Sequence, residues 1–308
     1  MIVELATASV GWIETTDDLG QIRYQETFAM RNIAIACILL TSLSGFAASN
    51  DTKPEDVIAK HLDSIGTAEA RVAVKSRGIQ GTLHFRELVG GMGDVTGNWG
   101  YVSQQRESNF VMKFGGGPWH GERFVFDGDK TSFAVFTSSH QPSPFGNFVR
   151  TQDFILKEGW LGGELSTGWA LENLEPSRGK LNYVGLKKVD DHDLQCIEYS
   201  PKANTDMMIK LYFDPDTHRH VMTIYSMVWE PGVGRDARSG PNQRQIRYTI
   251  EERFSDFQTD SGITLPRHYD LRYTQEPQNS PTRSYDWDMT ADKVFTNIGL
   301  DPANFQIK

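Results

Sequence analysis

Between residue 82 and residue 289, apolar and polar residues alternate in one short segment after another. Successive side chains of a β-strand point to opposite faces of its sheet, so a period of two indicates strands with one buried face. The segments with this period are residues 82–86, 110–114, 124–126, 132–136, 183–189, 194–199, 209–213, 221–229, 246–251, 268–273 and 285–289. They predict a mainly β fold of about ten antiparallel strands arranged as a meander.

Turn-forming residues separate several of these segments. Asp127-Gly128 is typical of a tight hairpin, and the polar runs 190–193, 214–217 and 259–262 each lie between two predicted strands. Such short connections place consecutive strands side by side. A sheet of this length curls, so we expect a curled antiparallel sheet or an incomplete β-barrel.

Helical spacing appears before the first strand and again in the middle of the chain. Apolar residues from Val57 to Ile65 recur with helical spacing, behind Pro54 and a capping box over residues 52–55. A second short helix is predicted over residues 67–75. Residues 141–146 are predicted to form a loop, and residues 153–159 a helix. The segment 142–168 thus interrupts the strands with an apolar, glycine-containing insertion, which we expect to act as a helical lid.

Residues 30–47 have the three parts of a secretory signal peptide. Met30 and Arg31 give a short basic start, residues 33–40 are apolar, and Gly45 and Ala47 suit a cleavage site. The apolar run is far below the ~20 residues that span a bilayer. We therefore expect cleavage after Ala47, a single mature domain over residues 48–308, and a periplasmic location.

Residues 1–29 do not resemble the start of a signal peptide, because they hold five acidic residues and one basic residue, Arg23. A signal peptide begins with positive charge. We expect translation to begin at Met30, so that residues 1–29 are a mis-assigned upstream start. An uncleaved anchor with a short acidic tail is the alternative.

Charge and cysteine content exclude several classes of function. The formal net charge of −9 argues against a nucleic-acid-binding surface. Cys37 lies in the signal peptide, which leaves Cys196 as the one cysteine of the mature chain. Neither an intramolecular disulfide nor a cysteine zinc site is then expected, and the apolar neighbours of Cys196 predict a buried, inert thiol.

Motifs for catalysis or metal binding are weak. His218-Arg219-His220 places two histidines on one face of a strand, but an exposed strand start is the simpler interpretation. Residues 190–193 lack the pattern of a calcium loop, and residues 115–117 lack the lysine of a phosphate loop. Asp286 and Asp288 share a strand face, either as a carboxylate pair or as the solvent side of the strand. We expect no catalytic residue, cofactor or metal.

Several short segments resemble LolA/LolB-type proteins, the outer-membrane lipoprotein carriers and their lipoprotein-sorting relatives. The resemblance lies in residues 57–66, 81–85, 210–217, 252–257 and 262–266, and is spread over residues 54–275. It implies an incomplete antiparallel barrel with a helical lid and an apolar cavity for acyl chains, without catalytic residues. The segments 142–168 and 230–243 make this chain longer than a minimal carrier.

The leading hypothesis is a monomeric, non-enzymatic carrier or sensor that binds the acyl chains of lipids or lipoproteins. The alternatives are an envelope interaction or signalling protein whose groove binds a protein segment, and an unrecognised hydrolase with a triad assembled in space. The residues predicted to line the cavity are Phe110, Met112, Phe114, Phe124, Phe126, Phe133 and Val135, with Phe154, Leu156 and Trp160 from the lid.

Overall fold

The computed structural model describes residues 52–89, 93–116, 120–136, 141–174, 177–202, 205–230 and 245–307. They belong to one compact unit, Asp51–Lys308. The proposed upstream segment 1–29 and signal peptide 30–47 lie outside the described residues, so both stay predictions. None of the helices in the described part of the chain is long and apolar enough to cross a membrane.

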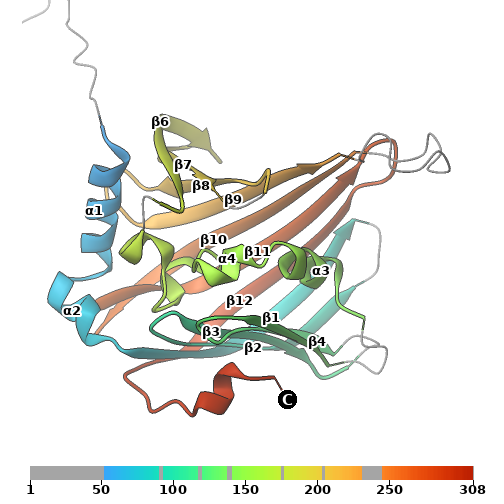
Figure 1. The fold of residues 1–308 in the computed structure, drawn as a ribbon, viewed down its shortest axis with the longest axis horizontal. Helices are drawn as coiled ribbons and strands as arrows, with labels where there is room; N and C mark the ends of the chain where they lie inside the picture. Colours follow the sequence, from blue (N-terminus) through green and yellow to red (C-terminus); the bar gives the residue numbers. More distant parts are fainter. Residues whose placement is uncertain are drawn as a thin grey trace, which may run out of the picture. The chain divides into compact units, whose positions relative to one another are not determined.

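Twelve antiparallel strands form one sheet in the order β5-β4-β3-β2-β1-β12-β11-β10-β9-β8-β7-β6 (Figure 1). The predicted mainly β, antiparallel class is therefore confirmed. The strands are β1 (Ser76–Val89), β2 (Asp94–Gln104), β3 (Glu107–Phe114), β4 (Gly121–Phe126), β5 (Thr131–Val135), β6 (Gly179–Val189), β7 (His192–Pro201), β8 (Met208–Phe213), β9 (His220–Trp229), β10 (Ile246–Asp260), β11 (Ile263–Pro277) and β12 (Arg283–Thr296).

The strand order differs from a single meander. Strands β1–β5 and β6–β12 are two meanders, and the first strand pairs with the last, with Leu83 opposite Met289 and Phe85 opposite Trp287. Strands β5 and β6, which are consecutive in the chain, lie at the two edges of the sheet. The segment that joins them must therefore cross the sheet.

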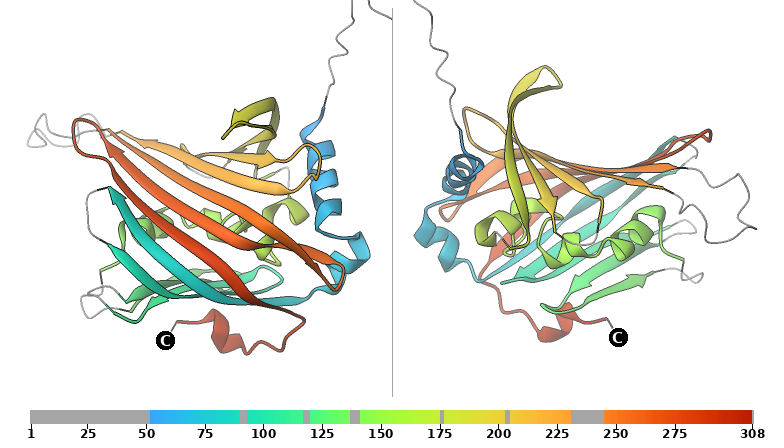
Figure 2. Two further views of the ribbon diagram at one scale, coloured as in Figure 1. Left: turned by 180° about the vertical axis from the view of Figure 1, so that it is seen from behind. Right: turned by 45° about the horizontal axis from the view of Figure 1, so that its top comes forward.

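This joining segment supplies the helical cover. It holds α3 (Pro144–Thr151), α4 (Phe154–Lys157) and two 3-10 turns, η1 (Gly163–Leu165) and η2 (Ala170–Asn173). Figure 2 shows the sheet curling around α3 and α4, which lie on its concave face. The loop predicted over residues 141–146 was wrong in its second half, because α3 begins at Pro144 behind the N-cap Ser143.

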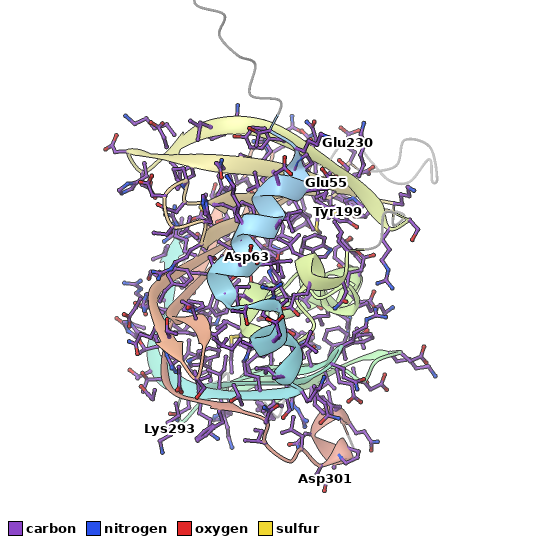
Figure 3. All side chains as sticks on the ribbon, turned by 90° about the vertical axis from the view of Figure 1, so that its left-hand side faces the viewer. Glu55, Asp63, Tyr199, Glu230, Lys293 and Asp301 are labelled. Atoms are coloured by element: carbon purple, nitrogen blue, oxygen red, sulfur yellow. The ribbon has the colours of Figure 1, made fainter. Side chains whose placement is uncertain are left out.

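Two further helices lie at one end of the sheet (Figure 3). They are α1 (Pro54–Ile65), on which Glu55 and Asp63 are labelled, and α2 (Ala68–Ala73). The inner face of α1 buries Val57, Ile58 and Ile65. The predicted capping box was wrong, because Lys53 occupies the N-cap and no side chain caps the helix. Pro54 does lie in the first turn, where its missing N–H costs no hydrogen bond.

The core fills the space between the concave face and the helices. Buried apolar residues from β1–β4, β7–β12 and the joining segment form this one main cluster. A smaller cluster of Leu194, Cys196, Tyr212 and Met222 lies on the opposite face of β7–β9. Cys196 is fully buried there, as predicted, and burial raises its thiol pKa.

Candidate functional site

Five of the predicted cavity residues are buried on β3 and β4. Phe110, Met112 and Phe114 share one face of β3, and Phe124 and Phe126 lie on β4. Phe110 packs against other rings of the protein, with ring centroids 5.7 Å from Tyr101 and 6.1 Å from Phe124. These side chains therefore fill space that the sequence-based hypothesis assigned to a ligand.

The other five predicted residues are divided between the sheet edge and the joining segment. Phe133 and Val135 on β5 are half-buried, as is Phe154 at the start of α4. Leu156 and Trp160 are buried, and the Trp160 ring lies 4.4 Å from that of Tyr199. The structure thus places nine of the ten side chains in or against the core, whereas Val135 is half-buried and belongs to neither cluster. Their part in ligand binding stays a prediction.

Helix α3 inserts two aromatic side chains into the concave face. The Phe145 ring lies 5.1 Å from Trp287, 5.6 Å from Phe124 and 5.8 Å from Tyr273, measured between ring centroids. Phe148 lies 5.5 Å from the same Tyr273 ring. Burying aromatic rings against each other is strongly favourable, so α3 is held mainly by these contacts. The sequence analysis missed this helix and both anchors.

An apolar cleft of about 370 Å³ opens beside the N-terminal end of α3. This volume is within the range of small-molecule sites, and apolar side chains form most of the wall. Phe114 is the one predicted cavity residue that lines it. The lining residues are Phe85, Glu87, Gly93, Val95, Phe114, Gly116, Pro142, Ser143, Pro144, Tyr285 and Trp287.

A second cleft, of about 380 Å³, lies on the other side of α3. It is lined by Phe148, Met227, Trp229 and Tyr248, among others, and Pro144 lines both clefts. Phe145 and Phe148 lie on the helix that separates the two. Helix α3 therefore divides what would otherwise be one longer apolar trough along the concave face.

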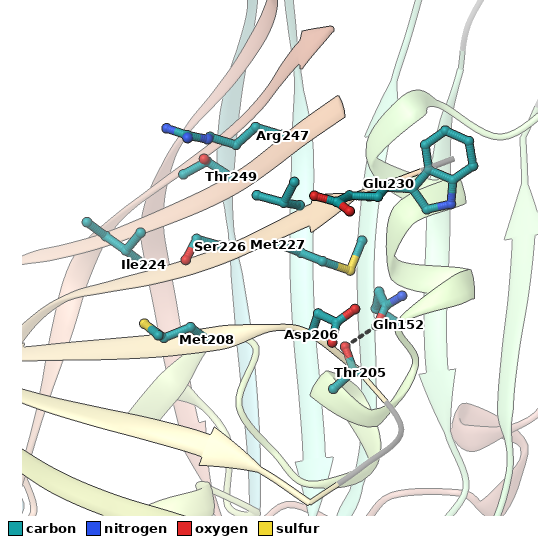
Figure 4. Close-up of a pocket in the computed structure, with 12 residues that line it drawn as sticks. Gln152, Thr205, Asp206, Met208, Ile224, Ser226, Met227, Glu230, Arg247 and Thr249 are labelled. Atoms are coloured by element: carbon teal, nitrogen blue, oxygen red, sulfur yellow. Dashed lines mark hydrogen bonds between the residues drawn. The ribbon is translucent and has the colours of Figure 1, made fainter. Parts of the chain in front are cut away.

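A larger depression, of about 820 Å³, is open and has a wall of mixed polar and apolar side chains (Figure 4). Asp206, Glu230 and Arg247 contribute charged groups to its wall, and the Thr205 hydroxyl donates a hydrogen bond to Gln152. A charged, open surface is a poor environment for a hydrocarbon chain. The two clefts beside α3 are the better candidates for an apolar ligand.

A buried carboxyl group holds the N-terminal end of α3 against β4. Glu122 accepts hydrogen bonds from the Ser143 hydroxyl (2.6 Å) and the Ser143 amide (3.2 Å). Gly146 leaves room for this carboxyl group, because a Cβ there would lie 2.2 Å from Oε2 of Glu122. Burial raises the pKa of Glu122 to about 7, although the Ser143 hydrogen bonds oppose the shift. Glu122, whose pKa lies near neutral pH, thus contacts Ser143 in the wall of the apolar cleft.

A second set of buried polar side chains is arranged in space like a catalytic triad. His220 contacts Glu164 through Nδ1 (3.0 Å) and the Thr223 hydroxyl through Nε2 (2.8 Å). All three side chains are buried, and none of them lines the clefts or the depression described above. A nucleophile must reach its substrate, so this arrangement supports a structural role. The exposed strand start expected for His218–His220 was wrong, because His220 is fully buried.

Further buried polar groups connect the helices to the sheet. Trp169 donates a hydrogen bond to His61 of α1 (3.1 Å), and burial lowers the pKa of His61 to about 4. Glu252 accepts hydrogen bonds from the Tyr225 and Tyr269 hydroxyls and from the Gly162 amide. The Gly162 contact ties the joining segment to the sheet, and the Trp169 contact ties the same segment to α1. The two tyrosine contacts link β9 and β11 to β10. They explain why polar residues occur in a core that the sequence analysis treated as apolar.

Asp286 and Asp288 do not form a carboxylate pair. The Asp286 side chain lies on the outer face of the sheet but is buried between Arg86 (2.6 Å) and Arg272 (3.0 Å), so it is also not exposed to solvent. Asp288 instead lies near His268 and Asp270. Within the described ranges, these last three residues are the one group whose donor atoms are close enough to share a metal ion.

Comparisons with known proteins give weak similarity to solved structures. No family model and no curated protein sequence matches the chain. A DUF1329 family protein from Desulfovibrio piger is 12% identical, covers 83% of this chain and 98% of its own, and has a TM-score of 0.44. A LolA superfamily protein from Nitrosomonas europaea is 12% identical over the same shares of both chains, with a TM-score of 0.40.

A putative outer membrane lipoprotein-sorting protein domain from Vibrio parahaemolyticus is 11% identical. It covers 80% of this chain and 97% of its own, with a TM-score of 0.35. The names of these last two structures belong to the family that the sequence motifs resemble. These TM-scores are too low to carry the fold assignment. It rests instead on the strand order and the helical cover of the sheet, which have the form that the resemblance of the sequence motifs implies.

Proposed function

We propose that this protein is a periplasmic, non-enzymatic carrier or sensor that binds the acyl chains of lipids or lipoproteins beside α3. The observation that carries the proposal is the apolar cleft of about 370 Å³ walled by Phe85, Val95, Phe114 and Trp287. Burial of an acyl chain contributes about 0.8 kcal/mol per CH₂ group. A cleft with aromatic walls therefore gives affinity without a charged partner.

The arrangement around α3 also supports a longer binding site. Each cleft alone is short, but the two are separated by α3 and share Pro144 at its start. A chain that displaced Phe145 and Phe148 would meet Tyr273 and Trp287, the rings these side chains now contact. The proposed ligand would thus replace one set of apolar contacts with another.

The test compares a charge placed in the cleft with the same charge placed outside it. Val95→Glu puts a carboxylate in the cleft wall, and a charge in an apolar site is costly. Val111→Glu makes the same change at a half-buried position of β3, on the face away from Phe110 and Met112. We expect Val95→Glu to lose binding of an apolar dye while its circular dichroism stays unchanged, and Val111→Glu to keep both.

Displacement of the dye by a fatty acid from the unmodified protein completes the test. Native mass spectrometry of protein purified from the periplasm would then identify any retained lipid by its mass. If the unmodified protein binds no dye, or if Val95→Glu binds it equally well, the acyl-chain proposal is wrong.

A protein segment is the second candidate for the ligand. Helix α3 itself shows that an amphipathic helix fits the concave face, with Phe145 and Phe148 as its anchors. A partner helix could occupy the same place by the helix-in-groove mode. A retained peptide mass instead of a lipid mass would favour this envelope interaction or signalling role.

The periplasmic location has its own test. Export and cleavage after Ala47 predict a mature N-terminus at Ala48, and a gene that starts at Met30 should give normal export. N-terminal sequencing of the exported protein checks both statements. Residues 1–29 on the exported protein would show that the proposed start and cleavage site are wrong.

A further inference from the structure

Three side chains with metal-binding donors meet at the centre of the sheet, on the face opposite α3. His268 and Asp270 lie on β11 and Asp288 on β12, the two middle strands of the twelve. The His268 Nε2 atom lies 3.3 Å from Oδ2 of Asp270 and 3.6 Å from Oδ1 of Asp288. All three donor atoms lie within 4.8 Å of one another. The residues come from two strands, so pairing of the sheet is what assembles them.

The two carboxylates face each other without a strong cation between them. Asp270 and Asp288 are direct cross-strand partners, and like charges in this position are destabilising. Arg253, opposite Asp270 on β10, bonds to Glu251 and Asp190 instead. In the described part of the chain, His268 is their one ion-pair partner.

The neighbouring carboxylate on this face differs, because its negative charge is balanced by arginines. Asp286, two residues before Asp288, is held between Arg86 and Arg272. Asp270 and Asp288 have no such ion pair with an arginine or lysine of the described residues, and Arg86, which also acts on them electrostatically, is already bonded to Asp286. Negative charge is thus neutralised at Asp286 but accumulates at Asp270 and Asp288, where a bound cation would balance it.

We propose that His268, Asp270 and Asp288 bind a divalent cation of the zinc type on the outer face of the sheet. Imidazole nitrogen and carboxylate oxygen are common zinc donors, with bonds of about 2.0–2.2 Å. In a tetrahedron with such bonds, the donors lie about 3.3 to 3.6 Å apart. The two distances from His268 match this spacing, and water would complete the coordination.

The backbone under this site is rigid, which favours metal binding. Tyr269, Leu271, Trp287 and Met289 alternate with the three donors along β11 and β12 and are fully buried on the other face. Sites built on packed strands hold their donors more accurately than sites on loops. The site is also separate from the clefts, because none of its residues lines them.

Calorimetric titration of the metal-stripped mature protein, prepared without a histidine tag, with zinc chloride tests the proposal. We expect one saturable site, weakened at least tenfold by Asp270→Asn and by Asp288→Asn. Asp193→Asn is the matched control, because Asp193 is exposed on β7, four strands away from β11 in the sheet, and belongs to no three-donor group. Its affinity for zinc should equal that of the unmodified protein.

Thermal unfolding separates metal binding from a simple ion pair with protonated His268. Without metal, Asp270→Asn should be at least as stable as the unmodified protein, because it removes the facing charge. With zinc, the unmodified protein should gain melting temperature and Asp270→Asn should not. No saturable site, equal binding by all variants, or destabilisation by Asp270→Asn in the absence of metal would overturn the proposal.

Discussion

The Ser143 hydroxyl, which caps α3, donates a hydrogen bond of 2.6 Å to the buried carboxyl group of Glu122 on β4. This contact joins the start of the helix to the sheet at the edge of the apolar cleft, because Ser143 also lines that cleft. Met112 and Val135, the strand neighbours of Glu122, carry no charge. No charged group of the described residues shifts its pKa, so only the Ser143 hydrogen bonds oppose the effect of burial.

Glu122 should therefore lower the stability of the protein as pH rises. Its pKa of about 7 in the folded state lies above the usual glutamate value of 4.5, so between these two pH values the folded state holds a proton that the unfolded state has lost. Stability from this group is complete below about pH 4.5 and is lost as pH rises through 7, by about 3 kcal/mol. Glu122→Gln, which stays neutral, should exceed the unmodified protein in urea stability at pH 8.

The effect of Glu122 must be measured as the difference in unfolding free energy between Glu122→Gln and the unmodified protein at each pH. Burial lowers the pKa of His61 to about 4, so its contribution rises with pH between about 4 and 6.5, the opposite direction. Both proteins contain His61, so its contribution to the pH dependence of stability cancels in the difference. A stability difference that does not change from pH 5 to pH 8 would contradict the titration of Glu122.

Phe145→Ala should loosen α3 without changing the sheet. Loss of a buried phenylalanine costs about 3–5 kcal/mol, and the side chain touches three other rings here. The vacated space lies on the helix between the clefts, so dye binding should increase while urea stability falls. Phe295→Ala, at an exposed position on β12, is the control and should change neither strongly. Unchanged dye binding by Phe145→Ala would show that α3 does not limit the apolar site.

Glu164→Gln should destabilise the protein through His220. Burial alone raises the pKa of Glu164, but the hydrogen bond and charge of His220 outweigh it and lower the pKa. Breaking a buried pair costs about 3–5 kcal/mol, whereas Glu55→Gln on the exposed face of α1 should change stability by less than about 0.5 kcal/mol. Urea unfolding measures both. Ester hydrolysis by the unmodified protein that Glu164→Gln abolishes would instead support the hydrolase alternative.

Cys196 should be unreactive in the folded protein. The side chain is fully buried, and burial raises the pKa of its thiol, so little thiolate is available. A water-soluble thiol reagent should label it in denaturant and leave it unlabelled in buffer. Rapid labelling of the folded protein would mean that the outer cluster on β7–β9 opens readily.

Local pattern predicted most strands because one face of each is buried. Strand β2 was missed, since Gly97 and Gly100 interrupt its alternation; Gly97 is required where the backbone of Lys113 approaches a Cβ position to 2.4 Å. Helix α3 was missed although Ser143 and Pro144 have the order of an N-cap and a first helical residue. These two signals for the start of α3 were present in the sequence, but both residues were assigned to a loop.

The candidate site was harder to predict than the strands. Periodicity correctly assigned Phe110 and Met112 to a buried face, but it does not say whether a ligand or another side chain covers that face. Here the cover is the protein itself, because α3 brings Phe145 to Phe124. The cleft is lined by Phe85, Tyr285 and Trp287, which come together only because β1 pairs with β12.

The pairing of β1 with β12 has a consequence for folding. Residues opposite each other in these strands are between 195 positions apart (Val89 and Ser284) and 219 positions apart (Arg77 and Thr296), so the centre of the sheet closes late and raises the contact order. Until the last strand has been made, one edge of β1 has no partner, and open edges invite aggregation. Each half can form hairpins early, but the complete sheet requires almost the whole chain.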